Sequence, residues 1–140
     1  MKIVVLKFGG TSVGTIEKIK KVSRIIGEFR KKKYKVIVVS SAMSGVTNEL
    51  VKKSRLLSEN FSESEYDVLV SSGEQMACSL IAGRLINNGF KSRSWLGWQL
   101  PIHTNGPYKN SRIYQINKNK IIKYLSCLLY TSDAADDGLS

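Results

Sequence analysis

The chain has 140 residues, 42% hydrophobic and 24% charged, which is typical of one soluble globular domain of modest size. Its net charge of +11, from 22 basic and 11 acidic residues, fits either an anionic partner or simply a lysine-rich surface. Two cysteines without metal-type spacing argue against a disulfide framework and favour a reducing compartment, and no apolar stretch is long enough to cross a membrane.

The first forty residues predict a strand, a helix and a second strand. Residues 2–7 form a short, β-branched apolar run that is typical of a buried strand. Apolar residues then recur every three or four positions over residues 15–32, which predicts an amphipathic helix. Residues 36–39 repeat the strand pattern. A unit of this length predicts two parallel strands joined by a right-handed crossover.

The connection after the first predicted strand, KFGGTSVG at residues 7–14, is typical of a phosphate site. Gly9 and Gly10 allow close backbone approach and positive φ, and the start of the following helix favours an anion. Lys7 would add a positive charge near the same oxygens. Because Lys7 precedes the glycines, this is not a Walker A loop. From spacing alone, a tight turn with an exposed lysine is an equally good interpretation.

Small hydroxyl residues dominate the connection after the second strand, SSAMSGVTN at residues 40–48. Ligands of open α/β sheets bind outside the carboxyl ends of the strands, so this loop and the glycine turn predict a shared cleft. The alternative is an ordinary helix-capping loop, because Ser and Thr cap helices well. A helix is predicted over residues 46–58.

The middle of the chain predicts a polar break at residues 59–65 and then an apolar helix that ends near Gly89. Glu74 is placed in the first turn of this helix, where by itself it fits a favourable partner for the helix dipole.

Beyond this helix the pattern weakens. Residues 90–96 predict a third strand, and residues 103–111 a polar loop in which His103 is a surface residue without a catalytic partner. Isoleucines from Ile113 onward indicate an approach to another helix.

The last fifteen residues differ in composition from the rest. Lysine and arginine are absent after Ser126, and the run CLLYTSDAAD resembles the translation of a transposase adapter used in DNA library preparation. We therefore predict that residues 126–140 are a non-native tail; the alternative is a native acidic tail.

Four stretches together resemble aspartate kinase (aspartokinase), of the amino-acid-kinase family. They are KFGGTSVG, VVSSAMSGVTN, SSGEQMACSLIAGRL and GWQLPIHT, and they match in type, order and spacing. The resemblance covers about residues 1–125, which would be the N-terminal part of the family's catalytic domain. It implies an α/β fold, namely a three-layer αβα sandwich with a mainly parallel sheet, here truncated.

The resemblance also implies a reaction. The family transfers the γ-phosphoryl group of ATP to the side-chain carboxylate of L-aspartate, giving 4-phospho-L-aspartate for lysine, threonine and methionine biosynthesis. The implied partners are L-aspartate and ATP with Mg²⁺, not nucleic acid or a membrane. The full-length protein would be a cytoplasmic homo-oligomer, and the 140-residue fragment alone would be inactive and poorly folded.

Site residues follow from the matching motifs. The resemblance implies that the ATP phosphates are bound by Lys7, Phe8, Gly9, Gly10 and Ser41. It also implies that Lys7 is the catalytic residue. It implies that the substrate aspartate is bound by Ser41, Thr47 and Glu74. No metal ligand is assigned, and Arg112 is in doubt because the tract around it only partly follows the family pattern.

Other interpretations stay open. Another amino-acid-kinase member could act on glutamate, acetylglutamate or a nucleoside monophosphate, and the parent could be a bifunctional aspartokinase–homoserine dehydrogenase. A nucleic-acid-binding module would also fit the charge, but no interleaved aromatic residues suggest base stacking.

Overall fold

The computed structural model describes residues 1–130, with side chains as far as Ser126. The chain divides into two compact units. The first comprises Met1–Ser94 with Pro107–Asn110, and the second comprises Trp95–Gly106 with the chain from Ser111 onward. Every predicted site residue belongs to the first unit.

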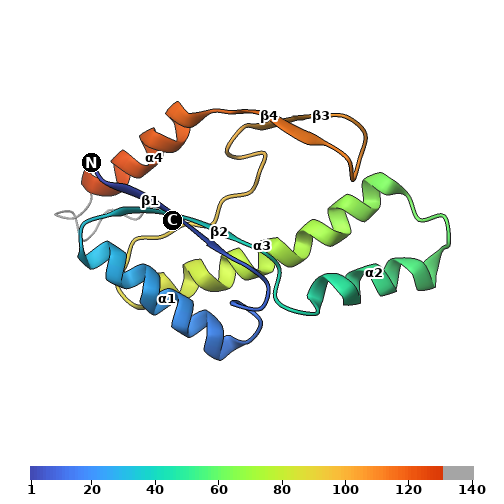
Figure 1. Cartoon of the computed structure of the whole chain (residues 1–140), viewed down its shortest axis with the longest axis horizontal. Helices are drawn as coiled ribbons and strands as arrows, with labels where there is room; N and C mark the ends of the chain where they lie inside the picture. The colour runs from blue at the N-terminus through green and yellow to red at the C-terminus, as the bar shows by residue number, and fades with distance from the viewer. Residues whose placement is uncertain (131–140) are drawn as a thin grey trace. The chain divides into compact units, whose positions relative to one another are not determined.

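The first unit contains the predicted strand–helix–strand motif (Figure 1). Its elements are β1 (Ile3–Phe8), α1 (Ile16–Lys31) and β2 (Lys35–Ser40). The two strands pair in parallel, from Ile3 opposite Lys35 to Phe8 opposite Ser40. The strand–helix–strand order and the parallel pairing are therefore confirmed, and so is the α/β class. The expectation of a buried strand is wrong for β1, because its alternate residues are exposed.

The core lies between α1, α3 (Glu63–Asn87) and one face of the sheet. Its fully buried members are Val13, Ile19, Val22, Ile26, Ile81 and Leu85. Alternate strand residues pack against this cluster, namely Leu6, Phe8, Val36 and Val38. Burying one such aliphatic side chain contributes about 1.5–3 kcal/mol, so the apolar stripe of α1 fixes how the helix lies on the sheet.

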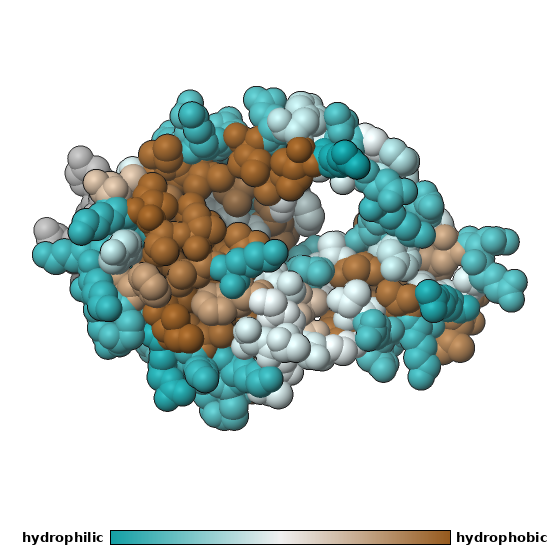
Figure 2. Space-filling model, viewed as in Figure 1, coloured by the Kyte–Doolittle hydropathy of each residue, from teal (hydrophilic) through white to brown (hydrophobic). Residues whose placement is uncertain are grey.

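The opposite face of the sheet is apolar but exposed. By strand alternation it carries Ile3, Val5 and Val39, whose exposed fractions are 41%, 60% and 48%. Figure 2 colours such hydrophobic residues brown on the surface. The prediction was a three-layer αβα sandwich. The first unit thus contains two of these layers, the sheet and the helices that cover one of its faces.

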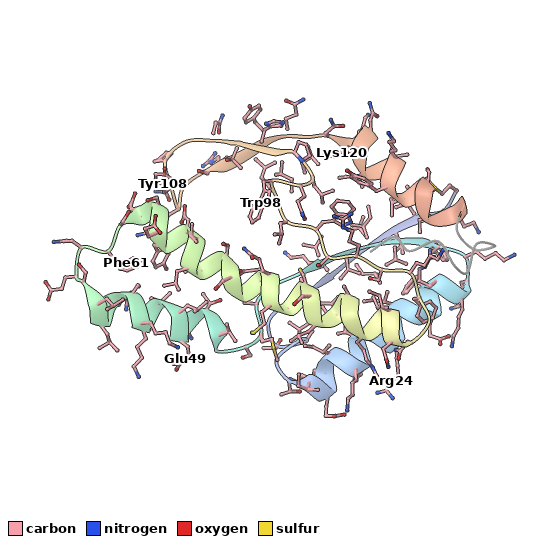
Figure 3. All side chains as sticks on the ribbon, turned by 180° about the vertical axis from the view of Figure 1, so that it is seen from behind. Arg24, Glu49, Phe61, Trp98, Tyr108 and Lys120 are labelled. Carbon is pink, nitrogen blue, oxygen red and sulfur yellow. The ribbon has the colours of Figure 1, made fainter. Side chains whose placement is uncertain are left out.

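Two helices follow β2 and pack against each other: α2 (Val46–Leu57) and α3 (Figure 1). Phe61, labelled in Figure 3, lies in the bend between them. The bounds of α2 match the predicted helix at 46–58.

The start of α3 corrects the prediction for residues 59–74. The helix begins at Glu63, so Glu74 lies in its middle, and the interpretation of Glu74 as a partner for the helix dipole is wrong. Ser71 and Ser72 lie inside this helix, and their hydroxyls donate to the carbonyls of Val68 (2.9 Å) and Leu69 (2.6 Å). These bonds satisfy both hydroxyls within the helix.

The end of α3 agrees with prediction, since Gly89 has φ +83° and its N–H donates to the Ile86 carbonyl. The predicted strand at residues 90–96 is wrong, because this segment has no strand pairing. Phe90 instead packs against the core, and its ring lies where a side chain at Gly27 would otherwise point.

The second unit contains a hairpin and a helix, β3 (Ile102–Asn105), β4 (Arg112–Ile116) and α4 (Lys118–Tyr130). The hairpin is antiparallel with an irregularity after His103. The predicted polar loop at 103–111 is thus partly strand, and Ile113 belongs to β4, not to a helix. His103 is exposed, as predicted.

In α4, Lys120 (labelled in Figure 3) lies near the ring of Tyr124, which stacks on Trp95 with centroids 4.2 Å apart. The predicted boundary after residue 125 falls inside this helix. Most of the predicted tail, residues 131–140, lies outside the described part of the chain, and its non-native origin stays a prediction.

Candidate functional site

The two predicted ligand-binding connections meet at the carboxyl ends of β1 and β2. Phe8 lies opposite Ser40 in the parallel register, and the Ser41 N–H donates to the Phe8 carbonyl at 3.1 Å. Both strands therefore end at the same level. Because of this register, the Gly9–Gly10 turn and the hydroxyl-rich loop begin side by side.

A second hydrogen bond holds the two connections together beyond the strands. The Ser44 N–H donates to the Gly10 carbonyl at 3.1 Å. Within the glycine turn, the Ser12 N–H donates to the Gly9 carbonyl at 3.0 Å, and Lys18 donates to the Thr11 carbonyl at 2.8 Å. The first connection is therefore a closed turn that also supports its neighbour.

The two glycines of this turn differ in their surroundings. A Cβ at Gly9 would meet no atom within 4 Å, whereas a Cβ at Gly10 would lie 3.0 Å from the Ala42 carbonyl oxygen. Neither glycine has a positive φ, so that part of the sequence interpretation is wrong. A glycine is needed at position 10 because the neighbouring loop packs directly against it. At Gly9, by contrast, the space next to the turn is open.

Lys7 is exposed on β1. Alternation places it on the sheet face opposite Leu6 and Phe8, which pack towards α1 and α3. Within residues 1–130, neither Lys7 nor Glu74 of α3 makes an ion pair. The structure thus brings the two loops together, but it does not join these two side chains, whose charges stay available to a ligand.

The start of α2 has no side-chain cap. Gly45 occupies the N-cap position with φ +84°, and no side chain accepts a hydrogen bond from the first turn. Among the described residues, the N–H groups of Thr47 and Asn48 also lack a backbone acceptor. The capping-loop interpretation of residues 40–48 is therefore wrong, and this helix start retains donors and the positive end of its dipole for an anion.

Glu74 is half-buried in the middle of α3, one residue after the buried Gly73. A Cβ at Gly73 would lie 3.1 Å from the Ala42 Cβ and 3.2 Å from the Val46 Cγ1. This close contact brings the segment that carries Glu74 against the hydroxyl-rich loop and the first turn of α2.

Cys78 lies one helical turn after Glu74. Its partial burial raises the pKa of the thiol, and the negative charge of Glu74 raises it further. This thiol is therefore a poor nucleophile at neutral pH, in agreement with its interpretation as a packing residue. Its pKa also responds to the charge at Glu74.

Sequence reasoning missed three glycines that shape the site: Gly14, Gly45 and Gly73. A Cβ at Gly14 would lie 3.1 Å from the Ser44 Cβ, so Gly14 and Gly73 both make room for the same loop. The sequence interpretation placed Gly73 just before the helix, so nothing marked it as a glycine in a helix interior.

Other kinds of site are not indicated in residues 1–130. These residues contain no cluster of three or more acidic, His or Cys side chains suited to a metal ion, and none of their helices has the length and apolar character that a membrane span needs. A shallow surface hollow along α2 is lined by Asn48, Val51, Lys52, Arg55 and Leu56. None of the predicted site residues lines it.

Comparisons with known proteins agree with this geometry. Residues 2–127 match the amino acid kinase family. The chain is 41% identical over 143 residues to the aspartokinase of Rickettsia prowazekii and 42% identical over 125 residues to that of Geobacillus stearothermophilus. These alignments cover 100% and 89% of this chain but only 32% and 31% of the relatives, so the chain spans about a third of their length.

Solved structures give the same relationship. Aspartate kinase from Synechocystis is 38% identical with a TM-score of 0.61, over 63% of this chain and 15% of that one. E. coli aspartokinase III, crystallised with aspartate and ADP, has a TM-score of 0.68 at 17% identity, over 90% of this chain and 39% of its own, and supports the fold alone. From the family match and these relatives together, the chain belongs to the amino acid kinase family.

Proposed function

We propose that this chain is the N-terminal part of a cytoplasmic aspartate kinase that transfers the γ-phosphoryl group of ATP to the side-chain carboxylate of L-aspartate. One observation carries the proposal. Two strand-end connections are hydrogen-bonded together, one with an open glycine turn beside an unpaired lysine, the other leading into an uncapped helix start. The aspartokinase relatives support aspartate as the acceptor.

The side chains suit this chemistry. A carboxylate is already a nucleophile, so the reaction needs no general base to remove a proton. Catalysis then consists of placing two anions in line and offsetting their charge. This calls for cations and oriented N–H groups, which are what the two connections offer.

Each predicted residue takes a role on this basis. Lys7 and the backbone from Phe8 to Gly10 bind the ATP phosphates, and Lys7 offsets charge on the transferring group. Ser41, where β2 ends, lies between donor and acceptor. Thr47 donates to the acceptor from the uncapped start of α2, and Glu74 binds its amino group. Mg²⁺ enters with ATP, bound to the phosphates.

The test is phosphoryl transfer by the full-length enzyme, measured as ADP release with MgATP and a panel of acceptors. We expect turnover with L-aspartate and little with glutamate, acetylglutamate or a nucleoside monophosphate. Turnover with another acceptor in place of aspartate would contradict the proposal. The 140-residue chain alone is the comparison, and we expect no turnover because it spans a third of its relatives.

The oligomeric state is a separate point. We propose that the full-length enzyme is a homo-oligomer, and light scattering of the purified protein tests this directly. A monomer at micromolar concentration would contradict it without affecting the assigned reaction.

A further inference from the structure

Gly73 occupies a position in α3 where glycine is costly. It lies near the middle of a helix that spans Glu63–Asn87, and glycine in a helix interior costs about 1 kcal/mol relative to alanine. A Cβ added at Gly83 of the same helix would meet no neighbouring atom within 4 Å, whereas the three atoms nearest to one added at Gly73 would lie within 3.5 Å. The cost at Gly73 therefore comes with a steric benefit that Gly83 lacks.

The three atoms nearest to a Cβ at Gly73 belong to the segment after β2. A side chain at Gly73 would lie 3.1 Å from the Ala42 Cβ, 3.2 Å from the Val46 Cγ1 and 3.5 Å from the Leu50 Cδ1. The first two distances are shorter than ordinary carbon–carbon contacts of about 3.5–4.0 Å. A methyl group here would move the loop or α3 by several tenths of an ångström.

Ala42 is held between two glycines. Its Cβ lies against Gly73, and its carbonyl oxygen lies 3.0 Å from where a Cβ of Gly10 would be. Ala42 itself is 5% exposed. We call this arrangement the Ala42 slot, made by Gly10 on one side and Gly73 on the other.

We infer that Gly73 is a positioning residue, which seats residues 41–47 in the Ala42 slot so that Ser41 and Thr47 face the acceptor bound at Glu74. The inference rests on the proposed function. Gly73 touches no substrate and acts through the loop alone. Because it immediately precedes Glu74, one contact fixes the hydroxyls and the carboxylate relative to each other.

The magnitude follows from the geometry. Displacing reacting groups by about 1 Å costs on the order of 100-fold in rate, so a shift of a few tenths should cost less. For Gly73→Ala in the full-length enzyme we expect KM for aspartate to rise about tenfold. KM for MgATP should rise less than KM for aspartate, because Lys7 and the Gly9 side of the turn do not contact the slot.

Gly83→Ala is the matched control, with the same substitution in the same helix and open space around the added methyl group. We expect it to leave both KM values unchanged. A merely structural role for Gly73 would lower the amount of folded enzyme but not the KM of the folded fraction. An unchanged KM for aspartate in Gly73→Ala, or an equal rise in Gly83→Ala, would overturn the inference.

A rescue variant keeps the test decisive if Gly73→Ala folds poorly. Ala42→Gly removes the nearest methyl group from the slot, so Gly73→Ala combined with Ala42→Gly should recover folding and bring KM for aspartate within about threefold of wild type. A double variant no better than Gly73→Ala would contradict the slot.

Amide hydrogen exchange separates this inference from the proposed function. If the wild-type enzyme does not turn over with aspartate, the proposed function fails, but the slot is still tested. Exchange over residues 41–47 should be about tenfold faster in Gly73→Ala and unchanged in Gly83→Ala. Equal exchange in both variants would overturn the positioning role.

Discussion

The two helices that follow β1 and β2 begin in different ways. At the start of α1, the Thr15 hydroxyl accepts a hydrogen bond from the Lys18 N–H at 3.2 Å, so the side chain of Thr15 caps this helix. At the start of α2, Gly45 occupies the N-cap position with no side-chain cap. The first helix start is closed and serves stability; the second is open and can serve binding.

This difference changes how the first connection can bind phosphate. The sequence suggested that the α1 start attracts the anion, but Thr15 already uses one of its donors. The Gly9–Gly10 turn ends five residues before Thr15, so in the proposed function the phosphates bind to Lys7 and the turn itself. In the same proposal, the helix dipole that favours an anion is that of α2, whose start has no side-chain cap.

The largest expected effect is the loss of the first connection's cation. Lys7→Ala in the full-length enzyme should lower kcat by about 10²–10³-fold, because one preorganised contact to developing charge contributes roughly 3–4 kcal/mol. Lys2→Ala is the control, since Lys2 is exposed and precedes the same strand. Steady-state turnover within tenfold of wild type would refute the role of Lys7.

The contact between the connections can be broken at Gly10. Gly10→Ala places a methyl group 3.0 Å from the Ala42 carbonyl oxygen, and overpacking of this kind costs about 1–3 kcal/mol. Gly9→Ala has open space and should cost far less. We expect amide exchange over residues 41–45 to accelerate at least fivefold in Gly10→Ala only. Equal exchange in the two variants would mean that the connections are not coupled.

The closed start of α1 can be opened at its cap. Thr15→Ala removes the acceptor of the Lys18 N–H, at a typical cost of about 1 kcal/mol. Exchange of the first-turn amides of α1 should rise about fivefold, with KM for aspartate unchanged. Thr11→Ala, an exposed threonine in the same connection, is the control. A changed KM in Thr15→Ala would show that the two helix starts do not have separate roles.

The smallest effect reports the charge at Glu74 through Cys78. Glu74 raises the pKa of the Cys78 thiol, so Glu74→Gln should lower that pKa and enlarge the reactive thiolate fraction at a given pH. For an i,i+4 pair we expect alkylation at pH 8 to accelerate up to about twofold. The measurement is made on the full-length enzyme and follows alkylation of the peptide that carries Cys78. An unchanged rate would mean that Glu74 does not act on this side of α3.

The chain up to residue 58 could be predicted closely because its apolar periodicity is strong and each element buries one face. The predicted helix at 15–32 is Ile16–Lys31 in the structure. The start of α3 could not be predicted, since Ser71 and Ser72 are turn formers unless their hydroxyls bond back to the helix. Strand β4 is exposed along its whole length, so no buried face marks it in the sequence.

The candidate site could be predicted only in part from the sequence. The edge rule for α/β sheets brought Lys7, Gly10 and Ser41 to one place from sequence alone. The uncapped start of α2 could not be foreseen, because the Ser and Thr side chains of this loop are also favoured helix caps. The role of Gly73 depends on which atoms a methyl group at this position would contact. Those contacts are visible only in the three-dimensional structure.

The most direct test is a crystal structure of the full-length enzyme with L-aspartate and a non-hydrolysable MgATP analogue. The account predicts the γ-phosphate within hydrogen-bonding distance of the Lys7 ammonium and the Gly9–Gly10 turn. It also predicts the aspartate side chain at the start of α2 near Thr47, and its amino group at Glu74. Both ligands bound away from the ends of β1 and β2 would contradict it.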